Sequence, residues 1–350
     1  MQEKNTKIQR ISPSHPELNK IKEAAEIIKG GGTVAFPTET VYGLGANALD
    51  ETAIEKIFLA KGRPQDNPLI VHISSIAQLD DLVENIPEKA YLLMERFWPG
   101  PLTLIFNRTN KIPDRITGGL STVAIRMPNN NIALELIKHS GLPIAAPSAN
   151  TSGKPSPTNS SHVIHDLSGK IDMIIDGGST GVGLESTVLD ISGDIPTILR
   201  PGGVTVEDLL TVLPEVEYDR AIEVIDKNII PKSPGQKYKH YSPNAKMIIV
   251  KGSLEEIIQK TTQLAKEYES KGMDVGIMAT KQTYYKYKNE NTLIVGDRDF
   301  LETIAANLFN VLREFDETNV DIIIAEGVEE KGIGKAIMNR MKKAAGGVIY

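Results

Sequence analysis

The segment Lys61-Gly-Arg-Pro-Gln-Asp-Asn-Pro-Leu-Ile-Val-His-Ile73 joins the end of a predicted helix to a short apolar strand. The glycine and the proline on either side of the arginine stop the helix, so Lys61 and Arg63 project from its end. Residues 68–73 read as a strand, with His72 opposite the valine before it. A charged loop that leads into a buried strand is where α/β proteins place anionic ligands. Taken alone, the segment is equally consistent with a basic surface turn.

Helix and strand patterns alternate on both sides of this segment. One helix is predicted after Pro16 and another after the N-cap residue Asp50. Further helices are predicted near 87–97, 130–140, 158–167 and 205–212, and strands at 33–36, 101–106, 122–127, 143–146, 171–175, 186–191 and 196–200. The mixture of hairpin-like and crossover spacings indicates an α/β domain with a twisted mixed sheet and flanking helices.

Three regions divide the chain. Residues 1–213 form the first α/β domain. Residues 214–245 are rich in proline and read as a linker, in which Ser233–Pro243 carries enough tyrosine, histidine and lysine to act as a lid over a ligand. Residues 246–350 alternate strands and helices as a smaller Rossmann-like α/β domain with a parallel sheet. Its last helix, 333–344, is basic, and we expect it to present a solvated face that includes Arg340 in preference to an RNA-binding patch.

The composition is that of an ordinary globular protein of 350 residues, with a net charge of −6. That charge argues against a general binder of polyanions but leaves room for a local basic cleft. The chain has no cysteine, which excludes disulfides, thiolate zinc sites and a cysteine nucleophile. Neither a membrane-spanning run nor a signal peptide is expected, so the predicted location is the cytoplasm.

Familiar phosphate and metal motifs are missing from the sequence. It contains no G-x-x-x-x-G-K-[ST], no G-x-G-x-x-G after a strand and no H-E-x-x-H, so a nucleotide site would have to be built in another way. His162 and His165 lie three residues apart on a predicted helix, but no carboxylate-rich or cysteine motif accompanies them, which makes a metal site the weaker interpretation.

Polar residues cluster where several predicted strands end. The loop Pro37–Gly45 offers hydroxyls, a carboxylate and a tyrosine, and is either a ligand loop or a turn that caps the next helix. Arg126 stands in an apolar strand and needs an anion, from a structural ion pair or from a bound carboxylate. Ser148 and Asn150 alternate with an alanine, so both can face an oxyanion or a phosphate. No G-x-S-x-G frames Ser148 as a nucleophile.

Together these segments predict a basic concave pocket lined by four cations: Lys61, Arg63, Arg126 and Arg200. The pocket is rich in hydroxyls and carries no carboxylate pair. Such a site suits a polyphosphate bound together with a carboxylate, and it does not suit a glycosidase or an acid protease.

Six segments, in order, closely resemble the YrdC-type threonylcarbamoyl-AMP synthases, and the proline-tyrosine linker and second domain resemble the longer, two-domain form. The segments are Thr33-Val-Ala-Phe-Pro-Thr-Glu-Thr-Val-Tyr-Gly-Leu-Gly45, the Lys61 segment, Trp98-Pro-Gly-Pro-Leu-Thr103, Val123-Ala-Ile-Arg-Met-Pro128, Ala146-Pro-Ser-Ala-Asn150 and Ser186-Thr-Val188. The linker reads Gly-Gln-Lys-Tyr where the family pattern has Gly-Met-Lys-Tyr, which is a small departure.

The resemblance implies a nucleotidyltransferase that makes threonylcarbamoyl-AMP and pyrophosphate from L-threonine, bicarbonate and ATP, with Mg²⁺ accompanying the ATP. The product would pass to a tRNA threonylcarbamoyl transferase for N6-threonylcarbamoyladenosine modification of tRNA. Whether the protein itself touches tRNA is left open.

The resemblance also implies roles for individual residues. The catalytic motifs would be Lys61 with Arg63 and Ser148 with Asn150. Threonine would be held by Thr40, His72, Arg126, Ala146 and Ser186. ATP would be held by Arg63, Asn67, Thr122, Ser148, Ser156 and Arg200, with Tyr238 added from the linker.

A binding module without turnover is the alternative function. A concave basic surface could hold double-stranded RNA or tRNA by its shape and phosphates. The acidic net charge counts against this hypothesis, and a salt-sensitive RNA affinity without ATP turnover would favour it.

Overall fold

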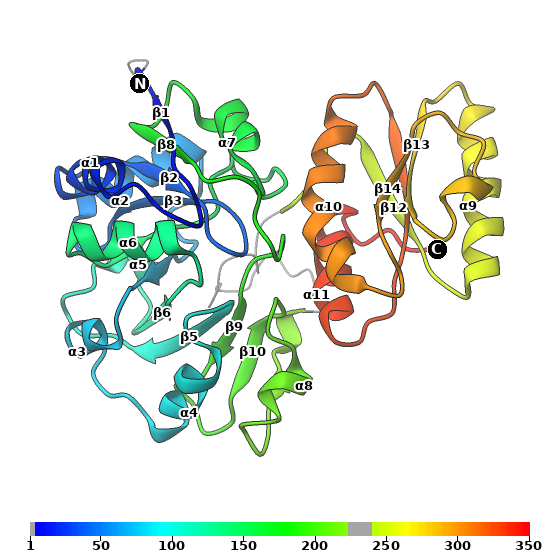
Figure 1. Cartoon of the computed structure of the whole chain (residues 1–350). Helices are drawn as coiled ribbons and strands as arrows, with labels where there is room; N and C mark the ends of the chain where they lie inside the picture. The colour runs from blue at the N-terminus through cyan, green and yellow to red at the C-terminus, as the bar shows by residue number, and fades with distance from the viewer. Residues whose placement is uncertain (1–3, 223–239) are drawn as a thin grey trace. The chain divides into compact units, whose positions relative to one another are not determined.

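The computed structural model describes residues 4–222 and 240–350, which form two compact units, each with its own sheet (Figure 1). The first unit takes in the described residues up to 222, except that 153–155 and 182–184 group with residues 240–350 in the second. Both units mix helices with strands, and the predicted α/β class is confirmed.

A mixed sheet forms the centre of the first unit, as the sequence predicted, and it has eleven strands. Its strands are β1 (Lys7–Arg10), β2 (Val34–Phe36), β3 (Gly43–Asn47), β4 (Ile70–His72), β5 (Leu102–Asn107), β6 (Thr122–Arg126), β7 (Ile144–Ala145), β8 (Met173–Asp176), β9 (Thr187–Asp190), β10 (Thr197–Arg200) and β11 (Glu217–Tyr218). Across the sheet the order is β1-β8-β2-β3-β7-β4-β6-β5-β9-β10-β11. Neighbours in sequence are therefore often apart in the sheet, so distant segments meet along it.

Helices cover both faces of this sheet. They are α1 (Leu18–Lys29), α2 (Glu51–Lys61), α3 (Leu79–Leu82), α4 (Glu88–Phe97), α5 (Asp114–Thr117), α6 (Asn131–Ser140), α7 (Ser160–Leu167) and α8 (Val206–Leu209), with short 3₁₀ turns at Ile76–Gln78 and Arg220–Ile222. The apolar stripes of α2, α4, α7 and α8 join one hydrophobic cluster. Those of α1 and α6 join a second cluster, with strand residues that alternate with members of the first.

Part of the second face is made of strand residues alone. A small cluster consists of Ile70, Ile105, Ala124, Val188 and Leu199, which come from β4, β5, β6, β9 and β10. Their neighbours along the strands point into the large cluster on the other face, so these five lie on the face that α1 and α6 share. We call these five residues the apolar floor.

Strand β3 was not expected, because the sequence pattern predicted a loop at Pro37–Gly45. It pairs antiparallel with both β2 and β7. A Cβ on Gly45 would come within 2.7 Å of the Phe36 ring and 2.8 Å of the Ile144 side chain. The glycine therefore reflects close packing inside a sheet, although in sequence it resembles a loop signal.

Helix α2 begins and ends where the sequence indicated. The Asp50 side chain accepts hydrogen bonds from the backbone N–H groups of Thr52 and Ala53, and Gly62 closes the helix in the left-handed conformation, with φ of 60°. The cap fixes the first turn, and the glycine lets the chain reverse directly after Lys61. Together they place Lys61 at the edge of the sheet.

The second unit is a four-stranded parallel sheet with helices on both faces (Figure 1). Its elements are β12 (Lys246–Val250), α9 (Leu254–Glu269), β13 (Val275–Thr280), a 3₁₀ turn at Tyr284–Lys286, β14 (Thr292–Gly296), α10 (Leu301–Asp316), β15 (Ile322–Glu326) and α11 (Ile333–Ala344). The predicted parallel Rossmann-like pattern is confirmed. Among all the described helices of the chain, none is both long and apolar enough to cross a bilayer.

The prediction of a basic solvated face on α11 is wrong for one of its residues. Arg340 is wholly buried, and its guanidinium carbon lies 5.5 Å from the centre of the Tyr241 ring. The Tyr241 ring in turn stacks on Phe309 at 5.1 Å. Lys342 forms an ion pair with Glu330 at 2.8 Å. Sequence periodicity counts Arg340 as polar, whereas an aromatic partner allows it to be buried.

Loss of the α2 cap should weaken the first unit. We expect Asp50→Ala to lower the free energy of unfolding by about 1 kcal/mol, because two backbone N–H groups lose their acceptor. The chain's one tryptophan, Trp98, lies buried in this unit, so its fluorescence during urea unfolding reports on this unit. Glu95→Ala, on the exposed side of α4, is the matched control and should leave the midpoint unchanged. Equal midpoints for both variants would show that the cap contributes nothing.

Candidate active site

Strand register aligns the predicted site residues along the apolar floor. Strand β4 runs parallel to β6 and pairs His72 with Arg126 and Ile70 with Ala124. Since residues two apart share a face, His72 and Arg126 lie on the same face as the floor and at one end of it. Thr122, the first residue of β6, marks the other end, four residues and therefore roughly 13 Å away.

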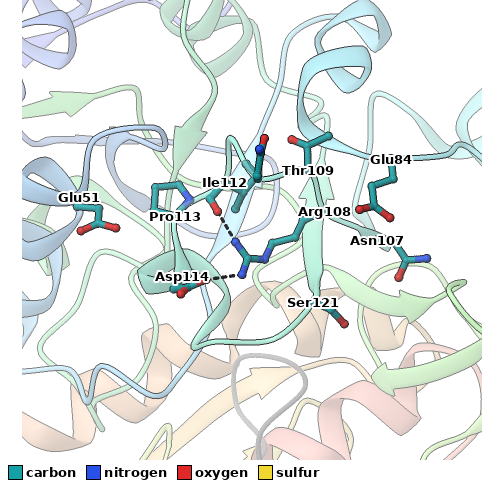
Figure 2. Close-up of a pocket in the computed structure, with 10 residues that line it drawn as sticks. Glu51, Glu84, Asn107, Arg108, Thr109, Ile112, Pro113, Asp114 and Ser121 are labelled. Atoms are coloured by element: carbon teal, nitrogen blue, oxygen red, sulfur yellow. Dashed lines mark hydrogen bonds and ion pairs between the residues drawn. The ribbon is translucent and has the colours of Figure 1, made fainter.

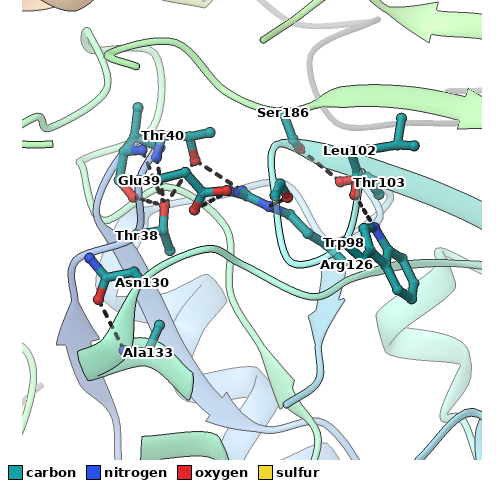
Figure 3. Close-up of polar contacts among 12 residues, drawn as sticks. Thr38, Glu39, Thr40, Trp98, Leu102, Thr103, Arg126, Asn130, Ala133 and Ser186 are labelled. Carbon is teal, nitrogen blue, oxygen red and sulfur yellow. Dashed lines mark hydrogen bonds and ion pairs between the residues drawn. The ribbon is translucent and has the colours of Figure 1, made fainter. Parts of the chain in front are cut away.

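Arg126 organises the first end of the floor (Figure 3). Its buried guanidinium donates from Nη1 to Thr40 Oγ1 at 2.9 Å and from Nε to the Gly100 carbonyl at 3.2 Å, and Nη2 lies 2.7 Å from Glu39 Oε2. Thr40 Oγ1 also lies 2.8 Å from the hydroxyl of Thr38. The loop between β2 and β3 thus supplies both a hydroxyl and a carboxylate to the arginine. Of the two sources of an anion considered for Arg126, the structure contains an internal ion pair.

His72 is an uncharged member of this group. Burial, together with the charge of Arg126, lowers the pKa of His72 to about 3. The ring meets Phe36 edge-on, with 6.4 Å between ring centres. At neutral pH the imidazole therefore offers hydrogen bonds but no positive charge to a ligand.

Ser186 links Arg126's neighbourhood to Arg200. The hydroxyl of Ser186 lies 2.7 Å from the Thr103 hydroxyl and accepts from Arg200 Nη2 at 3.2 Å, and its carbonyl accepts from Arg200 Nε at 3.1 Å. Figure 3 shows Ser186 and Thr103 beside the Arg126 group. Next to Ser186 in sequence, Glu185 accepts a 2.5 Å hydrogen bond from Ser156.

Lys61 and Arg63 gather at the other end with the Ser148 loop. The Lys61 ammonium donates to the carbonyls of Ser148, at 2.5 Å, and Asn150, at 2.6 Å. The Ser148 hydroxyl donates to Asn150 Oδ1 at 2.5 Å. Arg63 Nη2 donates to the carbonyls of Asn67 and Pro68. The two sequence motifs therefore meet through one lysine that fixes the loop carrying the serine and the asparagine.

The predicted residues within the described range all come from neighbouring strands or the loops beside them. Ala146 follows β7, and its N–H donates to the Ile70 carbonyl. Tyr238 lies outside the described residues. Sequence reasoning gave no role to Glu39 or Glu185, which border a pocket expected to lack a carboxylate pair. The signal for Glu39 was Arg126 itself, since a buried arginine requires a nearby anion.

A separate hollow of about 590 Å³ lies in the first unit, and none of the predicted site residues lines it (Figure 2). Arg108 projects into it but forms an ion pair with Asp114 and donates to the carbonyls of Ile112 and Leu120. Glu51 and Glu84 also line the hollow. Its charge is therefore negative overall, which makes it unsuitable for a polyphosphate.

The two histidines of α7 lie in different surroundings. His162 accepts a hydrogen bond from the Thr158 backbone at Nδ1, and His165 is exposed. Among the described residues, no group of three or more histidine or acidic side chains is placed to hold a metal ion.

Two family models match the chain. A model of the Sua5, YciO and YrdC family, described as telomere recombination, matches residues 26–202. A model described as threonylcarbamoyl-AMP synthase, C-terminal domain, matches residues 204–346. Both units of the structure thus fall within recognised families.

Full-length relatives agree with these matches. The chain is 53% identical to threonylcarbamoyl-AMP synthase of Bacillus subtilis over 338 residues, 96% of this chain and 95% of the relative. It is 52% identical to the enzyme of the same name from Pyrococcus abyssi, with 93% and 94% covered. The crystal structure of P. abyssi Sua5 complexed with L-threonine superposes with a TM-score of 0.94 at 50% identity, covering 98% of this chain and 99% of that one.

The buried His72 should couple stability to pH. Because its pKa falls from 6.5 to about 3 on folding, the unfolded chain takes up a proton between these values that the folded chain does not. This histidine therefore makes the free energy of unfolding decrease as the pH is lowered from 6.5 toward 3, by at most about 1.4 kcal/mol per pH unit. We expect His72→Gln to show a shallower loss when unfolding is followed by Trp98 fluorescence. His165→Gln, at an exposed position, should match the wild type, and three identical slopes would refute the prediction.

Proposed function

This chain belongs to the threonylcarbamoyl-AMP synthase family, in the form with a second, C-terminal domain, and on that premise we propose how its site joins L-threonine, bicarbonate and ATP. The products are threonylcarbamoyl-AMP and pyrophosphate. The observation that carries this function is a relative 53% identical over almost the whole chain. The cations and hydroxyls around the apolar floor supply what these substrates need.

Threonine is assigned to the Arg126 end of the floor. Its carboxylate would pair with the Arg126 guanidinium, which is already oriented by Thr40 and Gly100. The neutral imidazole of His72 and the hydroxyl of Ser186 would complete the polar contacts, with Ala146 at the side. The P. abyssi relative is known with L-threonine bound, which supports an amino-acid site in this fold.

ATP is assigned to a path along the floor between its two ends. Arg63, Asn67, Thr122 and Ser148 belong to one end, and Arg200 and Ser156 to the other. The apolar floor itself can face the base or the ribose. A nucleoside triphosphate is long enough to span the roughly 13 Å of β6. Tyr238 remains assigned to ATP by family resemblance.

The chemistry needs alignment more than acid–base catalysis. Threonine's amine first becomes a carbamate, and a carbamate oxygen then attacks the α-phosphorus in line and expels pyrophosphate. Lys61, Arg63 and Arg200 would neutralise the charge on the phosphates, and Mg²⁺ enters as part of the MgATP substrate. Lys61 also acts through the loop that it holds, because its ammonium donates to the carbonyls of Ser148 and Asn150.

The RNA-binding alternative has little support in this structure. The four site cations are 2%, 8%, 3% and 5% exposed for Lys61, Arg63, Arg126 and Arg200. Double-stranded RNA is a rigid helix, so it cannot insert its phosphates among buried side chains. We further propose that the product passes to a tRNA threonylcarbamoyl transferase, since a carbamoyl-phosphate anhydride is an activated donor that a second enzyme must consume.

The first test is pyrophosphate release from ATP by the purified chain. We expect release only when threonine and bicarbonate are both present, because the carbamate is the attacking group. Release with threonine alone in degassed buffer would indicate ordinary amino-acid adenylation. An RNA affinity without release under any condition would overturn the synthase assignment.

The second test separates loop positioning from folding. Lys61→Met keeps most of the length of the side chain but removes the hydrogen bonds to the carbonyls of Ser148 and Asn150. We expect pyrophosphate release to fall at least about 100-fold, because a misplaced loop spoils in-line alignment. The Trp98 emission of the folded variant should stay that of the wild type. Lys56→Met, on the same helix, is the control and should keep full activity. Full activity in Lys61→Met as well would contradict the role assigned to Lys61.

A further inference from the structure

Glu39 carries a buried carboxylate that its surroundings do not satisfy. Oε2 lies 2.7 Å from Arg126 Nη2, whereas Oε1 has no hydrogen-bond partner among the described residues, and both oxygens are shielded from solvent. The Glu39 carbonyl accepts from the Gly181 N–H at 3.1 Å, so the backbone of the loop is held in place. A buried carboxylate oxygen without a donor is costly, which indicates that a ligand supplies the donor.

Glu185, the other carboxylate near the site, is already engaged. It accepts a 2.5 Å hydrogen bond from Ser156, at the position assigned to ATP. Glu39 instead contacts Arg126, the side chain assigned to the threonine carboxylate, and lies beside Thr40 in the same loop (Figure 3). A group bound to Arg126 therefore has Glu39 as its carboxylate neighbour.

Threonine reaches the site as a zwitterion, and its ammonium group poses a problem that its carboxylate does not. The site contains four cationic side chains, which repel an ammonium group unless an anion offsets them. The ammonium must also lose a proton before its nitrogen can attack carbon. Both needs are met by one carboxylate placed within reach of the amine.

We propose that Glu39 is the receptor for the threonine ammonium group and the acceptor of its proton during carbamate formation. This inference rests on the proposed function. The ammonium donates to Oε1 and transfers a proton to Glu39, which leaves a neutral amine. The amine nitrogen then forms a bond to the bicarbonate carbon while a carbon–oxygen bond breaks and water leaves. The carbamate carries the negative charge, and the proton on Glu39 passes to solvent.

A purely structural role makes a different prediction. If Glu39 only orients Arg126, its loss weakens every ligand with a carboxylate, whether or not the ligand has an amine. If Glu39 binds the ammonium, its loss weakens only ligands with an amine. Two analogues separate these roles: (R)-3-hydroxybutyrate, which is threonine without its amine, and L-threoninol, which is threonine without its carboxylate.

The experiment measures calorimetric affinities of the full chain and Glu39→Gln for L-threonine and both analogues. We expect the preference for L-threonine over (R)-3-hydroxybutyrate to fall about tenfold or more in Glu39→Gln, and L-threoninol binding to weaken likewise. The hydroxybutyrate should bind at least as tightly as before, because Arg126 loses a competing anion. Glu135→Gln, which removes a carboxylate on α6, is the control and should behave as the wild type.

Kinetics provide an independent readout. For Glu39→Gln we expect pyrophosphate release at saturating threonine to rise about tenfold per pH unit below the pKa of the threonine amine, because the amine must then arrive already deprotonated. Glu39→Asp should restore part of the activity at neutral pH.

Equal weakening of L-threonine and hydroxybutyrate, or an unchanged preference, would overturn the role of Glu39 while leaving the synthase intact. If the wild-type chain failed to bind threonine or release pyrophosphate at all, the proposed function itself would fail.

Discussion

The guanidinium of Arg126 sets the central constraint of this structure, because a full charge inside a sheet must be surrounded by acceptors. Three acceptors from two separate segments meet that need: a hydroxyl and a carboxylate from the loop after β2, and a carbonyl from the turn before β5. Each acceptor fixes a segment that would otherwise be a surface loop. The ligand end of the floor is therefore held together by the same charge that recognises the ligand.

Most of the helices and strands could be predicted from the sequence, because burial of one face gives each element a regular spacing of apolar residues. The apolar spacing of α1 and α2, the capping aspartate of α2 and the alternation of the second unit all follow local rules. Strand β3 was not predicted because a glycine such as Gly45 is typical of a loop. The structure shows that Gly45 is needed because it packs against the Phe36 ring. The burial of Arg340 was not predicted for a related reason, since its aromatic partner Tyr241 comes from a distant part of the chain. Local patterns predict elements, and contacts between distant segments decide the exceptions.

The same division applies to the site. The cations and hydroxyls stand out as residue types at strand ends, so their positions could be predicted. Their partners could not, because Lys61 meets the carbonyls of the Ser148 loop some 90 positions away only when β3 and β7 are paired. The unassigned Glu39 illustrates the limit: its motif is visible in the sequence, while its contact with Arg126 depends on the fold.

The apolar floor has a consequence for how this site can change over evolutionary time. Because it is made of paired strands, its length advances in steps of one residue, and each step also reverses which face a side chain occupies. An inserted residue in β6 would turn Arg126 toward the large hydrophobic cluster and bring an aliphatic neighbour into the site. New substrate preferences can therefore arise by exchange of side chains or by remodelling of the bordering loops. The spacing between the amino-acid and phosphate ends cannot drift by small amounts, so the size of the joined product is fixed by the sheet.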